Sequence, residues 1–222
     1  MERFSLLKEG LSQEFLRIGV GGSLEEKLQD GLVKRNILEP SEAIHQFSDC
    51  TAWHRGGAET YIADSVIEVG STRKDRRHII AKALVSFGSQ PEVQRADWIK
   101  RRKILVGAGI RVPHLYYSDE GIILEEFIES ELHAPAYETE SVIKEIARIA
   151  VVLDRFGFTT FGFLDDLRIQ NDKVYFVDFG SDLGDPAEVP TERARNTLEL
   201  KLEEPYRSRC LSNYDRMMNK SE

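Results

Sequence analysis

The sequence has few cysteines and no long apolar run. Its two cysteines, Cys50 and Cys210, show no metal-ligand spacing and are too few for a disulfide framework. No run approaches the ~20 apolar residues that span a bilayer, and residues 1–10 are charged and lack the apolar core of a secretory signal. We therefore expect a cytoplasmic protein with reduced thiols and no membrane partner.

An excess of basic residues is also absent. The formal net charge is −8, whereas proteins that bind nucleic acid generally carry a basic surface. The basic run in residues 72–78 is typical of a solvated turn. The chain has 222 residues, of which 41% are hydrophobic and 31% charged, so it can form one sizeable core or two small lobes that share a cleft. The composition argues against a nucleic-acid partner and for a globular protein.

The first 45 residues carry a helical pattern. Ser23 followed by Glu26 resembles a capping box, which predicts a helix from Leu24 to about Val33. This N-terminal helical extension could pack on the rest of the protein or hold a partner, and we expect packing.

Short β-type runs begin at Ile44, and two features in them suit a phosphate ligand. Gly56 and Gly57 form a turn between two expected strands, and glycine lets backbone N–H groups approach phosphates, although an ordinary hairpin has the same pattern. Lys82 interrupts an apolar strand over residues 79–85. Burying an ammonium there is costly without an anionic partner, so Lys82 is either a functional residue or an edge-strand lysine that faces water.

Local signals predict the elements of the second half of the chain. They are a helix over Pro91–Gly107, which begins with a proline suited to a first helical turn, a strand over Gly121–Ile128, a helix from Glu140 to about Phe156 with a buried apolar stripe, and a hairpin over Ile169–Phe179 that turns at Asn171-Asp172. A polar, helix-like stretch over residues 191–203 and a charged tail follow.

The predicted hairpin ends in Asp178-Phe179-Gly180. A hydrophobic strand that ends in Asp-Phe-Gly is the way protein kinases present a magnesium-binding carboxylate to the phosphates of ATP. The triplet alone is a weak signal, because an Asp and a Gly after a strand are ordinary loop chemistry. Its meaning depends on the features that precede it.

The order of these features resembles the protein-kinase-like superfamily, and in detail its small bacterial branch of aminoglycoside phosphotransferase and lipopolysaccharide-kinase type. The resemblance covers about residues 52–186. It implies an α+β, two-lobed protein-kinase-like fold with an antiparallel N-lobe sheet and a reduced helical C-lobe. The expected division is a helical extension over residues 1–45, an N-lobe with its hinge over 46–128, and a minimal C-lobe over 129–222.

The resemblance also implies ATP and Mg²⁺ as cofactors. Lys82 matches the strand lysine that holds the α and β phosphates, and Asp178 matches the magnesium ligand. Asp97, on the helix after the strand, stands for the glutamate that normally pairs with that lysine. The turn at Gly56 and Gly57 would lie over the phosphates. Backbone groups of the hinge would meet the adenine, with Glu125 and Phe127 as its candidate residues.

The catalytic loop departs from the family pattern. Relatives carry a segment like His-Gly-Asp-Leu-His-Pro-Gly-Asn-Ile-Leu before the hairpin, and residues 161–170 occupy that place here. Phe163 then stands where the catalytic Asp belongs, and Arg168 stands where the metal-binding Asn belongs. Phe has no acceptor atom, and Arg brings a positive charge to a metal position.

Three functions fit this pattern. In the first, a phosphotransferase moves the γ-phosphate of ATP to an unknown small-molecule or protein acceptor, with Asp165 or Asp166 as a displaced catalytic carboxylate beside Lys82; a solvated turn would have the same two residues. In the second, Arg168 partly replaces the charge of the metal, and a degenerate pseudokinase binds nucleotide as a scaffold. In the third, an interaction module docks partners through the basic face of residues 100–103.

Overall fold

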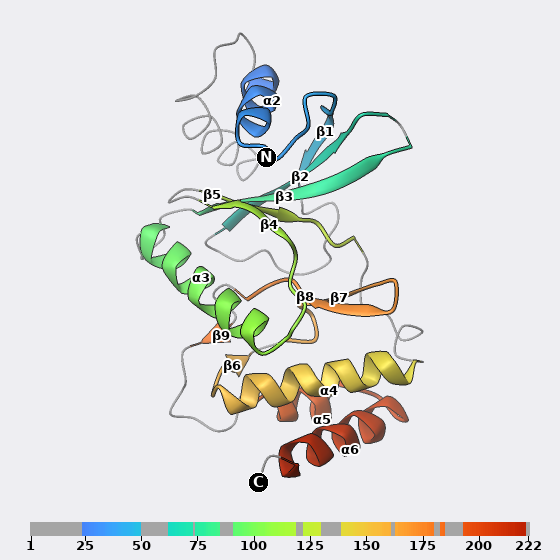
Figure 1. The fold of residues 1–222 in the computed structure, drawn as a ribbon. Coiled ribbons are helices and arrows are strands. Elements are labelled where there is room, and N and C mark those ends of the chain that lie inside the picture. The colour runs from blue at the N-terminus through green and yellow to red at the C-terminus, as the bar shows by residue number, and fades with distance from the viewer. Residues whose placement is uncertain are drawn as a thin grey trace. The chain divides into compact units, whose positions relative to one another are not determined.

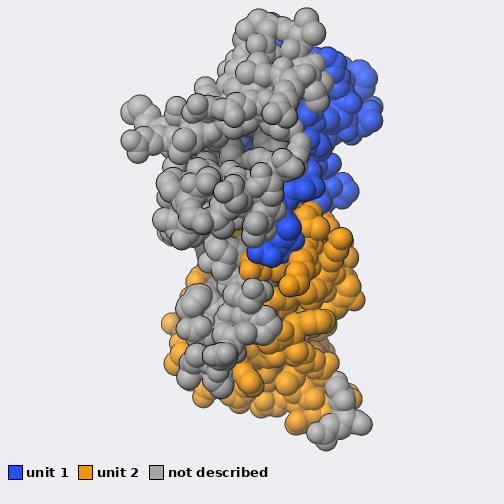
Figure 2. All heavy atoms as spheres, turned by 90° about the vertical axis from the view of Figure 1, so that its left-hand side faces the viewer, with its two compact units in different colours: residues 1–97, 113–127 blue, residues 98–112, 128–222 orange. Residues whose placement is uncertain are grey.

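The computed structural model describes residues 24–49, 62–72, 74–84, 91–118, 122–129, 139–160, 163–179, 183–184 and 193–220. The chain divides into two compact units, the first made of residues 1–97 and 113–127 and the second of residues 98–112 and 128–222 (Figure 2). Among the described helices, none is long and apolar enough to cross a membrane.

The first unit is built on a five-stranded antiparallel sheet (Figure 1). Its order across the sheet is β1 (Ala43–Asp49), β2 (Ile62–Gly70), β3 (Arg76–Leu84), β5 (Ile122–Glu126) and β4 (Leu115–Ser118). This is the antiparallel N-lobe sheet that the sequence predicted. β3 lies in the middle of the sheet, between β2 and β5.

The turn between β2 and β3 requires a glycine at its start. A Cβ atom on Gly70 would lie 2.1 Å from the carbonyl oxygen of Asp75. That distance is far inside van der Waals contact, so any larger residue would push the two strands apart.

Successive side chains of a strand point to opposite faces of the sheet. Helix α2 (Leu24–Lys34) covers one face, and Leu32 packs there with Ile79 and Ala81 of β3. The buried residues of this cluster are Leu32, Ile37, Leu38, Ile67, Val69, Ile79, Ala81 and Leu124. The helix predicted for residues 24–33 is therefore confirmed, and it packs on the sheet as expected.

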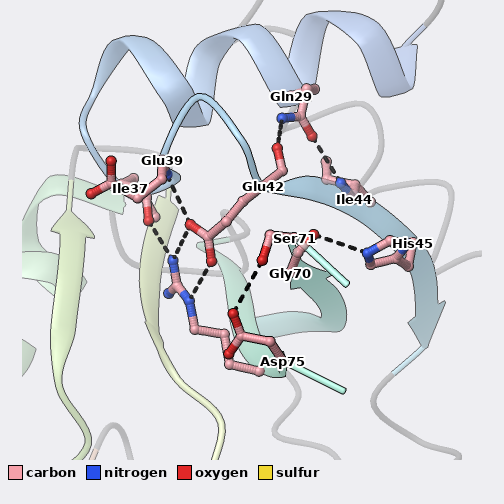
Figure 3. Close-up of polar contacts among 10 residues, drawn as sticks. Gln29, Ile37, Glu39, Glu42, Ile44, His45, Gly70, Ser71 and Asp75 are labelled. Atoms are coloured by element: carbon pink, nitrogen blue, oxygen red, sulfur yellow. Dashed lines mark hydrogen bonds and ion pairs between the residues drawn. The ribbon is translucent and has the colours of Figure 1, made fainter. Parts of the chain in front are cut away.

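Polar contacts hold the end of α2 and the start of β1 to the sheet (Figure 3). The side chain of Gln29 donates to the carbonyl of Glu42 at 2.7 Å and accepts from the N–H of Ile44 at 2.8 Å. Arg77 of β3 donates to the carbonyl of Ile37 at 2.7 Å and pairs with the carboxylate of Glu42 at 3.1 Å. The hydrogen bonds between Arg77 and the Glu42 carboxylate lower the pKa of Glu42.

The second unit is mainly helical. Helices α5 (Ala194–Lys201) and α6 (Tyr206–Asn219) pack against α4 (Glu140–Arg155), as Figure 1 shows. The predicted apolar stripe of α4 is confirmed, because Val142, Ile143, Ile146, Ile149, Ala150 and Leu153 are all buried. A short ladder joins β6 (Thr159–Thr160) to β9 (Leu183–Gly184), and β7 (Leu167–Gln170) pairs with β8 (Lys173–Phe176).

The hairpin of β7 and β8 turns where the sequence predicted. Asn171 and Asp172 have φ angles of 52° and 58°. Two successive residues with positive φ are typical of the tight turn that matches the twist of an antiparallel pair, and Asn and Asp tolerate that conformation. The turn delivers β8 into Val177 and Asp178.

Helix α3 (Pro91–Gly107) coincides with the predicted helix, and its later residues belong to the second unit. Arg148 of α4 holds the end of α3 by donating to the carbonyls of Ala108 at 2.9 Å and Gly109 at 2.8 Å. Arg148 also pairs with Glu145 at 2.6 Å. The carbonyls at a helix end lack partners within the helix, so this guanidinium caps α3.

The end of the chain differs from the sequence prediction. Residues 206–219, predicted as part of a charged tail, form α6. The buried positions of α6 are Cys210, Asn213 and Tyr214. Helical spacing was present, but two of these three residues are polar or aromatic, so no aliphatic stripe signalled a helix.

Candidate functional site

Lys82 lies near the end of the central strand β3 and is buried. Its ammonium nitrogen is 3.1 Å from Oε1 of Glu125 on β5, and the two side chains are only 5% and 1% exposed. In the register of the two strands, Lys82 lies opposite Ile123, so Glu125 is its diagonal neighbour on the same face. An edge-strand lysine that faces water is therefore excluded.

Glu125 was predicted as a hinge residue, and its pairing with Lys82 was missed. The sequence pointed instead to Asp97, which lies partly exposed on α3; a contact between Lys82 and Asp97 stays a prediction. One signal for Glu125 was present. A lysine and a glutamate within separate apolar strands are each costly to bury alone, so opposite charges in two such strands are expected to meet.

The hinge residues use their backbone within the first unit. The N–H of Phe127 donates to the carbonyl of His78 at 3.0 Å, and the N–H of Glu126 donates to the carbonyl of His114 at 2.8 Å. The side chain of Phe127 is buried against Val66 and Ile80. Phe127 places an apolar side chain on the face that carries Lys82, and a contact of the hinge backbone groups with adenine stays a prediction.

Asp178 follows β8 in the second unit, and its position is held by its neighbour. Phe179 is completely buried, and its ring stacks on Trp98 of α3 with ring centroids 5.0 Å apart. The ring centroid of Phe176 of β8 lies 6.2 Å from that of Phe179. Gly180 lies outside the described residues. The aromatic anchor keeps the Asp178 side chain at the end of the hairpin.

Oδ1 of Asp178 is a buried acceptor, and no hydrogen-bond donor reaches it within the part of the chain that the structure describes. Such an oxygen costs free energy unless a ligand or ion completes it. Mg²⁺ prefers carboxylate oxygens, and it often binds through one or two carboxylates together with phosphate and water. The described residues contain no group of three or more His, Cys, Asp or Glu that could cage a metal. The buried oxygen of Asp178 thus fits a cation as its ligand.

The residues at the expected catalytic-loop positions have structural roles. Phe163 is 0% exposed and belongs to the core. Arg168 on β7 donates from Nη1 to the carbonyls of Asp165 and Leu167, both at 2.7 Å. Neither the base nor the metal-binding amide of the family pattern is replaced at its own position.

The two displaced carboxylates differ in their surroundings. The side chain of Asp165 is 73% exposed and pairs with Lys201 of α5 at 2.5 Å. Asp166 is half-buried, and its carbonyl accepts from the N–H of Val177 at 2.9 Å. Asp166 is therefore held beside the segment that carries Asp178, whereas Asp165 lies on the surface.

Two other predicted features have different outcomes. Gly56 and Gly57 lie outside the described residues, so their role over phosphates stays a prediction. The basic run of residues 100–103 lies on α3, where Lys100 and Lys103 are exposed and Arg101 and Arg102 are half-buried.

The five-stranded antiparallel sheet of the first unit and the helices of the second unit are those of a protein-kinase-like fold. Among solved structures, the chain is similar to APH(2″)-IIa in its ternary complex with streptomycin and ATP, at 11% identity over 91% of this chain and 89% of that chain, with a TM-score of 0.50. It is also similar to the macrolide 2′-phosphotransferase MphH from Brachybacterium faecium, at 8% identity over 85% and 82% of the two chains, with a TM-score of 0.50.

Sequence comparison adds nothing to this likeness. No family model matches the chain, and no curated protein matches it. The low identities establish the fold alone, and the function must be argued from the residues of the site.

Proposed function

We propose that this chain binds ATP with Mg²⁺ and transfers the γ-phosphate to a small-molecule acceptor. The observation that carries the proposal is the buried Oδ1 of Asp178, which accepts no hydrogen bond from the described residues and stands directly before the anchored Phe179. A carboxylate kept in that state is expected to serve a cation. The similarity to APH(2″)-IIa, solved with ATP, supports a nucleotide as the ligand that brings it.

The candidate residues would contact different parts of the nucleotide. The Lys82 ammonium, held by Glu125, donates hydrogen bonds to phosphate oxygens. Asp178 would hold Mg²⁺, and the bound ion would neutralise the charge that develops on the phosphates during transfer. The apolar side chains of Val66, Ile80 and Phe127, on the same face as Lys82, suit a nucleobase.

Asp166 is the proposed proton acceptor. In the transfer step, the acceptor hydroxyl oxygen forms a bond to the γ-phosphorus, the bond from that phosphorus to the β,γ-bridging oxygen breaks, and ADP leaves. The hydroxyl proton passes to the carboxylate of Asp166. Phosphoryl transfer depends mostly on positioning and charge neutralisation, so a carboxylate displaced from the family position can serve. Asp165 is less suited, because it is exposed and paired with Lys201.

A second function, nucleotide binding without transfer, is favoured by one observation. Phe163 occupies the family position of the catalytic Asp and is fully buried, so no rearrangement of its side chain supplies an acceptor. In this alternative, the chain is a pseudokinase that binds partners in a nucleotide-dependent way.

Two measurements test the proposal. The first is calorimetric titration of ATP into the wild-type protein and Asp178→Asn, with and without Mg²⁺. We expect binding that needs both Mg²⁺ and Asp178; if the wild-type protein does not bind ATP, the proposal fails. The second follows the ³²P label of γ-labelled ATP into water and into pools of hydroxylated small molecules. Label transfer that is lost in Asp166→Asn and kept in Asp165→Asn supports the enzyme, and Mg²⁺-dependent binding without transfer supports the pseudokinase.

A further inference from the structure

The ion pair of Lys82 and Glu125 is contained within one sheet. β3 and β5 are hydrogen-bonded neighbours, and in their register Ile80 lies opposite Glu125 while Lys82 lies opposite Ile123. Both side chains therefore point to the same face from adjacent strands. Their separation is set by the sheet, and strands hold side chains more precisely than loops do.

The surroundings make the pair expensive. Lys82 and Glu125 are 5% and 1% exposed, and their face of the sheet also carries the apolar residues Val66, Ile80 and Phe127. A buried ion pair is seldom more stable than well-packed apolar side chains in its place, because both charges lose their hydration. A charge pair among apolar side chains on a sheet face is therefore a candidate for a functional role.

We infer that Glu125 is the positioning residue for Lys82, so that the phosphate-binding ammonium is oriented from within the sheet. The inference rests on the proposed nucleotide binding. An ammonium has three donors, so a hydrogen bond to Glu125 is compatible with hydrogen bonds to phosphate oxygens.

The first test compares ATP with adenosine. Glu125→Gln should weaken ATP binding about ten- to a hundredfold, the size of one hydrogen bond to a charged group, and should leave adenosine binding within about twofold, because Lys82 contacts only phosphates. A merely structural role would weaken both ligands equally. The matched control is Glu68→Gln, which removes a carboxylate from another ion pair of the same sheet, with Arg76, and should change neither affinity.

Asp97→Asn is the rival variant. If α3 supplied the partner of Lys82, this change would weaken ATP binding more than Glu125→Gln does, and the inference would be overturned. Equal loss of ATP and adenosine binding in Glu125→Gln would overturn it as well.

A double-mutant cycle covers the case in which Glu125→Gln does not fold because it leaves Lys82 unpaired. Lys82→Met with Glu125→Gln removes both charges and should fold. If Glu125 acts through Lys82, the double variant binds ATP as Lys82→Met does; a further tenfold loss contradicts the inference. If the wild-type protein binds ATP but the losses of affinity caused by the two single changes simply add in the double variant, the proposed function stands and the role of Glu125 fails. If the wild-type protein binds no ATP, both fail.

Discussion

The phenolic O–H of Tyr214 donates to Oδ2 of Asp154 at 2.7 Å, which joins α6 to α4. The same carboxylate accepts from the backbone N–H groups of Ala194 at 2.8 Å and Arg195 at 3.1 Å, at the start of α5. Those N–H groups have no partner within their helix, and an anion is favoured at a helix N-terminus. One side chain thus ties together three helices of the second unit.

Asp154→Ala should therefore destabilise the protein by about 2–4 kcal/mol, the sum of a lost helix cap and a lost hydrogen bond to a charged group. Urea unfolding followed by circular dichroism measures this loss. Tyr214→Phe keeps the ring and removes one hydroxyl, so it should cost about 1–2 kcal/mol. A Tyr214→Phe variant less stable than Asp154→Ala would show that the carboxylate is not the centre of this contact.

Cys210 predicts a loss of stability at alkaline pH. Burial raises the pKa of its thiol to about 12, with a smaller contribution from the charge of Glu140. The thiol is exposed in the unfolded chain and ionises there at lower pH, so the unfolded state gains charge first. The contribution of Cys210 to stability is complete below about pH 8.5 and decreases as the pH rises toward 12, by up to about 1.4 kcal/mol per pH unit.

The test compares wild type and Cys210→Ala in urea unfolding between pH 7.5 and 10.5. The difference in free energy of unfolding should stay constant up to about pH 8.5 and then shift in favour of the variant. Tyrosine and lysine titrations occur in both proteins and cancel in the difference. A difference that does not change with pH would mean that the thiol is not buried as described.

Glu42 should lose its contribution to the free energy of unfolding at acid pH rather than at alkaline pH. Its hydrogen bonds with Arg77 hold its pKa below the ordinary value, so the contribution of Glu42 to stability is present at neutral pH and is lost as the pH falls through that lowered value. Glu42→Gln should be less stable than wild type at pH 7, and this difference should shrink at an acid pH below the ordinary glutamate range. Glu39→Gln, an exposed change in the same loop, is the control and should match wild type at both pH values.

Asp178 predicts opposite effects on stability and on binding. Oδ1 of Asp178 is buried without a donor among the described residues, so neutralising this side chain removes an unfavourable group from the folded protein. Asp178→Asn should raise the free energy of unfolding by about 0.5–2 kcal/mol while abolishing the Mg²⁺-dependent part of ATP binding. Thermal unfolding without ligand and calorimetry with ligand measure the two effects. A destabilised variant would show that Asp178 serves the fold rather than a cation.

Much of the chain could be predicted from local signals. The helices α2, α3 and α4 and the turn at Asn171 and Asp172 arise from capping residues, a first-turn proline, apolar spacing and side chains that tolerate positive φ. All of these signals act over a few residues, so they can be recognised without knowledge of the fold. The same holds for the Asp178-Phe179 pair after β8, which needed only the hairpin before it.

The pairing of distant side chains could not be predicted in this way. Glu125 meets Lys82 because β5, and not β4, lies beside β3, and Asp154 meets Tyr214 because α6 packs on α4. Periodicity decides to which side of a strand or helix a side chain points. The order of the strands and the packing of the helices decide which residues it contacts there. The residue types of the proposed site can thus be recognised in the sequence, while the pairing of Lys82 with Glu125, the burial of Phe163 and the exposure of Asp165 follow from packing between segments far apart in the chain.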